Sequence, residues 1–217
     1  AIAQAGMEGS WGANVGQTLR EVYGEDVRFL ARAYAAAGSD ARMSGCEMPV
    51  IIVSGSGNQG ITASVPVAIY AQAMGIGRER LLRAVALADL VTVHQKAGIG
   101  CLSAFCGATC AGCGAGAGIA YLLGGDYKAV AHTIVNALAV VSGMVCDGAK
   151  PSCAAKISSA IDAGILGYEL YCRGQEFLDG DGIIRKGVDN TIGNVGRMAR
   201  SGMRETDRVI LDIMCGC

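Results

Sequence analysis

The chain has 217 residues, a net charge of -1 and 33 glycines, and aromatic residues make up only 5% of it. This length can bury the core of one domain, and the few scattered basic residues exclude an electrostatic footprint for nucleic acid. Residues 1–16 lack the basic and apolar regions of a signal peptide, so we expect a cytoplasmic chain whose ten cysteines are reduced thiols.

The first half of the chain is predicted to form helices around one short strand. Apolar residues recur at helical spacing over three segments: 17–37, 59–74 and 78–96. The first should end at Gly38-Ser39-Asp40, and Pro66 should kink the second. The β-branched run 49–53 predicts the strand, which leads directly into a glycine-rich loop.

The second half contains a long uncharged stretch, from Ala97 to Gly125, that could span a bilayer. It has no aromatic belt and no basic flank beyond Lys96, which favours a buried central helix over 102–124 instead. Further helices are predicted over 128–144, 151–170, 188–200 and 205–214. The predicted fold is therefore mainly α, a compact bundle of packed helices around a glycine-rich buried helix. We expect residues 1–217 to form one domain with no membrane contact.

The loop Ser54-Gly55-Ser56-Gly57-Asn58-Gln59-Gly60 joins the predicted strand to a helix. N–H groups at a helix start lack intrahelical partners, so this loop can bind a carboxylate or a phosphate, or it can be a plain turn. No Gly-Lys-Ser/Thr ends it, which excludes a Walker loop. It also resembles the Ser-x-Gly-Asn loop of pyridoxal-phosphate enzymes that catalyse β-elimination, but those enzymes alternate strands and helices.

Three cysteines are candidate metal ligands. Cys146 and Cys153 lie seven residues apart across a turn, and Cys106 would approach them from a neighbouring helix. Soft thiolates select zinc or iron–sulfur clusters. Cysteines are also small buried hydrophobes, which is the interpretation we prefer for Cys110, Cys113 and Cys172.

Few other side chains are candidates for chemistry. The two histidines, His94 and His132, lie on helical segments and are expected to be structural. Lys96 and Lys150 lie beside the motifs in a region with few charges. Each lysine either extends to the surface or lies near a bound anion.

Taken together, these segments resemble the L-cysteine desulfidase family, the iron–sulfur relatives of the L-serine dehydratase α domain. The run Cys-Asp-Gly-Ala-Lys at 146–150 is the specific part of this resemblance. The resemblance places the family's cluster ligands on Cys106, Cys146 and Cys153. The matching segments are Ser39–Met43, Ser54–Ile61, Leu102–Gly107, Tyr121–Asp126, Met144–Cys153 and Glu205–Asp207.

The resemblance implies a lyase that uses a [4Fe-4S] cluster and converts L-cysteine to pyruvate, ammonia and sulfide. L-Serine is the alternative substrate. Lys96 is the first candidate for the base or carboxylate binder, and Lys150 is the second. Substrate binding is assigned to Gly55, Ser56, Gly57, Asn58, Gln59, Gly60 and Ser103. The alternative from another class is a non-catalytic helical domain that binds zinc and an anion.

The chain departs from the family pattern in two respects. Family members are about twice as long and carry an N-terminal half, so we expect the partner to be that half or a separate subunit, with a homodimer left open. Cys101 replaces an arginine that is frequent in the family. The ending Cys215-Gly216-Cys217 is similar to that of serine dehydratases in which a C-terminal cysteine caps the cluster at rest.

Overall fold

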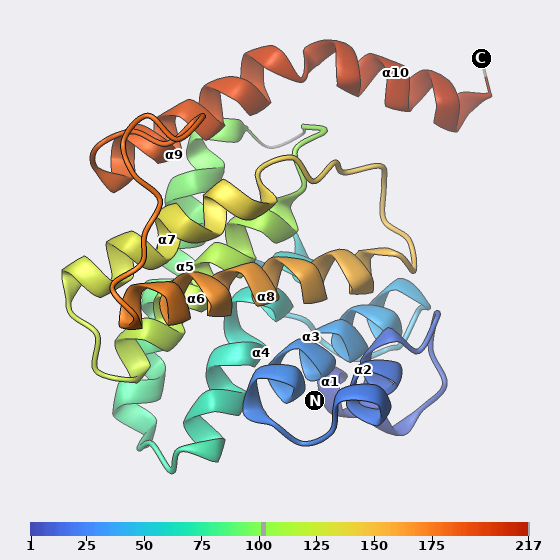
Figure 1. The fold of residues 1–217 in the computed structure, drawn as a ribbon. Coiled ribbons are helices and arrows are strands. Elements are labelled where there is room, and N and C mark those ends of the chain that lie inside the picture. The colour runs from blue at the N-terminus through green and yellow to red at the C-terminus, as the bar shows by residue number, and fades with distance from the viewer. Residues whose placement is uncertain (101–102, 217) are drawn as a thin grey trace.

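A computed structural model describes residues 1–100 and 103–216 of the chain. The described part is mainly α, as predicted, and forms a packed helix bundle without a named strand (Figure 1). Within it, no helix combines the length and the apolarity needed to cross a membrane. The helices are α1 (Ile2–Glu8), α2 (Val15–Tyr23), α3 (Val27–Met43), α4 (Gly57–Ala73), α5 (Arg78–Ile99), α6 (Gly107–Leu122), α7 (Tyr127–Val141), α8 (Cys153–Cys172), α9 (Val188–Arg197), the π-helical turn η1 (Met198–Gly202) and α10 (Arg204–Cys215).

Helix α6 is the buried centre of the bundle, and almost all of its residues are shielded from solvent. It packs against α4, α5, α7 and α8. Its glycines allow these close approaches. A Cβ at Gly112 would meet the carbonyl oxygen of Ala160 in α8 at 2.4 Å, and one at Gly116 would meet that of Gly164 at 2.6 Å. The prediction of a glycine-rich buried helix is thereby confirmed.

The segment 17–37, predicted as one helix, is divided between two helices, α2 and α3. The prediction therefore missed a break within the segment and misplaced the helix ends. Gly24 has a φ of 79°, a conformation that ends helix α2. The carboxylate of Asp26 then accepts a hydrogen bond from the backbone N–H of Arg28 and caps α3. Helix α3 continues through Gly38, whose missing side chain leaves room for packing against neighbouring helices. The other predicted helices are present, with ends shifted by a few residues.

The predicted strand over 49–53 is also wrong. Only Val53 pairs, in an isolated bridge with Ser56, and the side chain of Ile51 is 81% exposed. The segment packs its backbone against the start of α4 instead, since a Cβ at Gly60 would lie 1.9 Å from the carbonyl oxygen of Ile51. A β-branched run forms a strand only where a neighbouring strand accepts its hydrogen bonds, and none lies here in the described residues.

Candidate active site

Three helices begin at one pocket, which has a volume of about 310 Å³. Cys106 immediately precedes α6, Cys153 is the first residue of α8, and Asn58 lies in the first turn of α4; all three line the pocket. A helix N-terminus presents unpaired N–H groups and a partial positive charge. The three helix starts together therefore favour a bound anion and the thiolate form of cysteine.

A short antiparallel contact brings Cys106 beside Cys146. The N–H of Cys106 donates to the carbonyl oxygen of Met144 at 3.0 Å, and the N–H of Cys146 donates back to the segment before Cys106. This pairing occupies the residues just before α6. The helix predicted over 102–124 therefore begins only at Gly107, while its predicted first residue lies outside the described part of the chain.

The two thiols interact directly. The Cys106 thiol donates a hydrogen bond to the sulfur of Cys146, which lowers the pKa of Cys146 to about 6. The backbone N–H of Gly148 and the charge of Lys156 act in the same direction. The same shared proton, together with burial, raises the pKa of Cys106. The pair therefore favours the thiolate on Cys146 rather than on Cys106.

The lysines of this region have different surroundings. Lys96 is only 7% exposed, lines the pocket, and forms no ion pair with any described residue. Lys150 is not among the pocket-lining residues and pairs with Asp147 at the surface. Lys156 lines the pocket and pairs with the same Asp147. Sequence reasoning missed Lys156, although it lies three residues after Cys153, about one helical turn along α8.

Some residues of the glycine-rich loop line the pocket, and others pack closely against neighbouring groups. Gly57 and Gly60 do not line the pocket, but both lack a side chain where another group packs closely. Gln59 is 5% exposed, and its Oε1 has no hydrogen-bond partner in the described structure. The predicted substrate-binding residues that line the pocket are Gly55, Ser56, Asn58, Gln59 and Ser103.

Arg42 is a pocket residue that sequence reasoning did not single out. It lies in the last turn of α3, and its Nη1 donates to Oδ1 of Asn58 at 3.2 Å. It lies in the family-matching segment 39–43, but that match assigned it no role, because α3 meets the start of α4 only in the folded chain. Arg42 adds a positive charge to the side of the pocket formed by the glycine-rich loop.

The remaining cysteines differ in burial. Cys110 and Cys113 are fully buried in α6, as expected, and burial raises the pKa of Cys110 to about 12. Cys172 is exposed, so its predicted burial was wrong: it is the last residue of α8, where the helix reaches solvent. Cys101 and Cys217 lie outside the described residues. Across the described residues, no three His, Cys, Asp or Glu side chains are placed to hold one metal ion.

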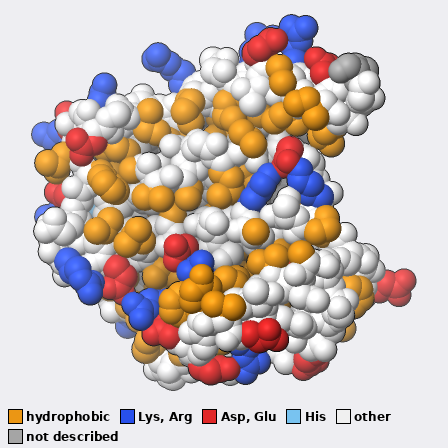
Figure 2. Space-filling model, turned by 45° about the vertical axis from the view of Figure 1, so that its right-hand side comes forward, with side chains coloured by type: hydrophobic (Ala, Val, Ile, Leu, Met, Phe, Trp, Pro, Cys, Tyr) orange, Lys and Arg blue, Asp and Glu red, His pale blue; other side chains and the backbone are white. Residues whose placement is uncertain are grey.

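Helix α10 reaches over the loop that carries Gly148. A Cβ at Gly148 would meet Cε of Met214 at 3.0 Å, so the end of α10 touches the rim of the pocket. Figure 2 shows the surface hollowed beneath the projecting end of this helix, with basic and acidic side chains together at the hollow. The pocket therefore opens toward solvent beside α10.

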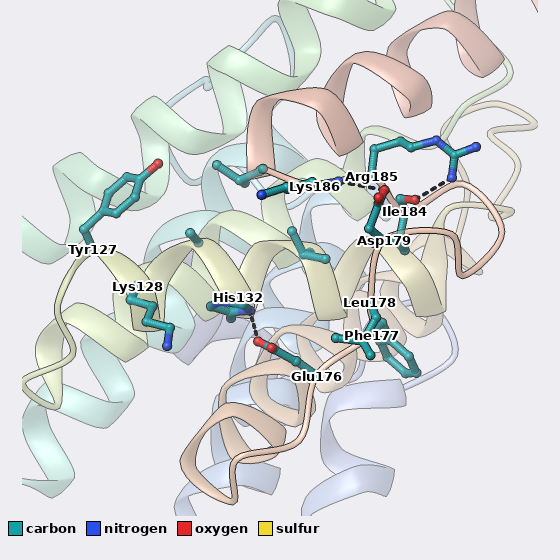
Figure 3. A pocket seen from close by; sticks show the side chains of 14 residues that line it. Tyr127, Lys128, His132, Glu176, Phe177, Leu178, Asp179, Ile184, Arg185 and Lys186 are labelled. Carbon is teal, nitrogen blue, oxygen red and sulfur yellow. Dashed lines mark hydrogen bonds and ion pairs between the residues drawn. The ribbon is translucent and has the colours of Figure 1, made fainter.

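A second pocket, of about 400 Å³, lies between α7 and the segment that leads into α9. Figure 3 shows two polar contacts in it: His132 pairs with the carboxylate of Glu176, and Arg185 donates a hydrogen bond to the carbonyl oxygen of Ile184. The His132 ring also stacks on Tyr171, with centroids 5.6 Å apart. None of the predicted site residues lines this pocket.

Comparison with known proteins identifies the family of the chain. The model of the serine dehydratase alpha chain family matches residues 1–212. A UPF0597 protein of Desulfitobacterium hafniense is 64% identical over 214 residues, which cover 99% of this chain and 50% of that protein. UPF0597 proteins of Lachnoclostridium phytofermentans and Finegoldia magna are 53% and 49% identical over 213 residues, 98% of this chain and 51% of each relative.

The chain thus spans about half the length of the curated relatives it matches. No solved structure matched it. The family model covers nearly the whole chain, including every residue that lines the pocket of the three helix starts. The chain therefore belongs to the serine dehydratase alpha chain family.

Proposed function

We propose that this chain is the cluster-binding part of an iron–sulfur-dependent lyase that converts L-cysteine to pyruvate, ammonia and sulfide. The observation that carries the proposal is the meeting of three thiols and three helix N-termini at one pocket. Family membership supports β-elimination as the class of reaction. Cysteine is preferred over serine as the substrate because soft sulfur binds iron–sulfur iron better than a neutral hydroxyl does.

The donor set of the pocket suits a [4Fe-4S] cluster. Cys106, Cys146 and Cys153 line the same cavity, and thiolates that bind a cubane ligate different irons. They therefore need to surround a cavity rather than meet at a single ion. Cys106, Cys146 and Cys153 would hold the cluster, which would supply Lewis-acid chemistry toward the leaving group.

The chain's own residues would bind and orient the amino acid. The amides at the start of α4, with Asn58, are placed to hold its carboxylate. Lys96 is the first candidate to take the α-proton, because it lines the pocket and has no ion-pair partner in the described residues. Loss of the α-proton and of sulfide leaves aminoacrylate, which tautomerises and reacts with water to give pyruvate and ammonia.

The test is turnover by the complete protein, reconstituted with iron and sulfide in the absence of air. We expect pyruvate and sulfide from L-cysteine, inactivation by air, and no loss of activity with borohydride, which would trap a pyridoxal Schiff base. The other half of the protein, corresponding to the length that the relatives have in addition, is expected to be required. Turnover of neither amino acid, with zinc bound instead of iron, would favour the non-catalytic domain.

A second candidate is dehydration of L-serine, and the family match favours it, since the matching family is that of the serine dehydratase alpha chain. The pocket residues would act in the same way, with water as the leaving group. The ratio of kcat/KM for L-cysteine and L-serine in the same preparation separates the two. A higher value for L-serine would replace the first candidate by the second.

A further inference from the structure

Arg42 lies in an unusual position for a structural arginine. Its guanidinium lines the pocket and has one hydrogen bond, to the neutral amide oxygen of Asn58. No carboxylate of the described residues pairs with it, whereas Arg32, on the same helix, pairs with Asp162 at 2.9 Å. A planar guanidinium with donors to spare is suited to bind a carboxylate from outside the chain.

The start of α4 is shaped to receive this guanidinium. A Cβ at Gly57 would lie 2.6 Å from Nε of Arg42, so the arginine packs closely over the first turn, where glycine has no side chain. The unpaired N–H groups of that turn lie on the same side of the pocket as the guanidinium. Both features favour a negative charge at this place.

Two buried side chains independently indicate a missing ligand. Oε1 of Gln59 is an acceptor without a partner in the described structure, although Gln59 is 5% exposed. Lys96 is 7% exposed and forms no ion pair with a described residue. Both line the pocket. Buried polar groups are normally satisfied, so an amide acceptor and a lysine amine without partners among the described residues point to a bound polar molecule.

We propose that Arg42 binds the carboxylate of an α-amino acid and that Gln59 Oε1 accepts a hydrogen bond from its ammonium group. This inference rests on the proposed function in taking an amino acid as the substrate. A bidentate arginine would fix the plane of the carboxylate, and Gln59 would fix the side on which the ammonium lies. The side-chain end of the ligand is then directed toward the thiols that line the rest of the pocket.

The experiment uses L-alanine, which has both charged groups but no leaving group, in calorimetric titrations of the purified chain. Arg42→Gln should weaken the binding of L-alanine at least about tenfold, since it removes charge-assisted hydrogen bonds. Arg42→Lys, which keeps the charge but loses the planar fork, should bind with intermediate affinity. Ethylamine, which lacks the carboxylate, should bind equally weakly to the wild type and to Arg42→Gln.

Arg32→Gln is the matched control, because it removes an arginine of α3 that lies outside the pocket. It should leave the affinity for L-alanine unchanged. If Arg42→Gln does not fold, Arg42→Lys alone decides: an affinity equal to that of the wild type overturns the inference. Unchanged L-alanine binding in Arg42→Gln overturns it even if L-cysteine is turned over. Arg42-dependent binding without turnover supports it while the proposed function fails.

Discussion

Lys96 and Lys150 have different surroundings in the structure, although each lies beside a sequence motif. We expect Lys96→Met to lower kcat for L-cysteine about a hundredfold or more, the range typical of losing a general base, while iron content is retained. Lys150→Met should have a much smaller effect, because Lys150 is bound to Asp147 outside the pocket lining. Steady-state kinetics with iron analysis measure both. A larger loss in Lys150→Met would contradict this assignment.

Asp40 is a buried carboxyl group with a structural role. It is 1% exposed, and its Oδ2 accepts the backbone N–H of Gly16 near the start of α2. Its Oδ1 has no partner in the described structure. Burial raises the pKa of Asp40, and the hydrogen bond from Gly16 opposes this only in part. The native protein therefore binds this proton more tightly than the unfolded chain does.

The raised pKa of Asp40 predicts a pH dependence of stability. The free energy of unfolding should fall as pH rises from the ordinary aspartate pKa, about 3.9, through the raised native pKa. Asp40→Asn should remove this fall, measured by urea unfolding at several pH values. Asp26→Asn is the control of opposite sign. Arg28 donates hydrogen bonds to the carboxylate of Asp26 and lowers the pKa of Asp26 to about 2. The contribution of Asp26 to the free energy of unfolding is therefore lost as pH falls toward that value. If the free energy of unfolding of Asp40→Asn fell with pH as it does in the wild type, the raised pKa of Asp40 would be contradicted.

Sequence reasoning singled out candidate site residues that have a local pattern, and missed pocket-lining residues that depend on tertiary contacts. The cysteines and the loop could be recognised because their spacing and composition are unusual. Arg42 could not, since only the packing of α3 against α4 brings it to the pocket. Lys156 had a weak local signal, one helical turn after Cys153. Cys172 was misplaced because residue type alone does not show where a helix reaches solvent.

At the level of elements, helical periodicity predicted the existence of helices better than their ends. The break at Gly24 depends on one glycine with positive φ, which a mostly apolar periodic pattern hides. The opposite error occurred at Gly38, because a buried glycine within a helix resembles a stop signal. The run 49–53 has strand propensity but no partner strand in the described residues. Without the hydrogen bonds of a neighbouring strand, this propensity alone does not form a strand.

The packing of α6 against α8 gives a prediction about stability. Gly116→Ala should lower the free energy of unfolding by about 1–3 kcal/mol, because the new Cβ overlaps the backbone of Gly164. Gly193→Ala is the matched control, since Gly193 is exposed in α9 with no atom within 4 Å of the added Cβ. It should be stabilising by up to about 1 kcal/mol. Urea unfolding measures both. Equal stability of the two variants would contradict the close packing of α6.

At the scale of the whole molecule, the buried helix α6 connects the fold to the site. It packs on α4 and α8, and all three helices begin at the same pocket. The small residues that allow close packing thus also determine where the helix N-termini and the thiols meet. The chain spans about half the length of the curated relatives it matches, and α10 lies at the rim of the pocket.

The most direct test of the account is the iron and acid-labile sulfide bound per chain after reconstitution without air. We expect about four of each in the wild type, as for a [4Fe-4S] cluster. Serine in place of Cys106, Cys146 or Cys153 should abolish this binding. Cys110→Ala should keep it, because Cys110 is buried in α6 away from the pocket lining. Full iron content in any of the three serine variants, or its loss in Cys110→Ala alone, would contradict the shared cluster.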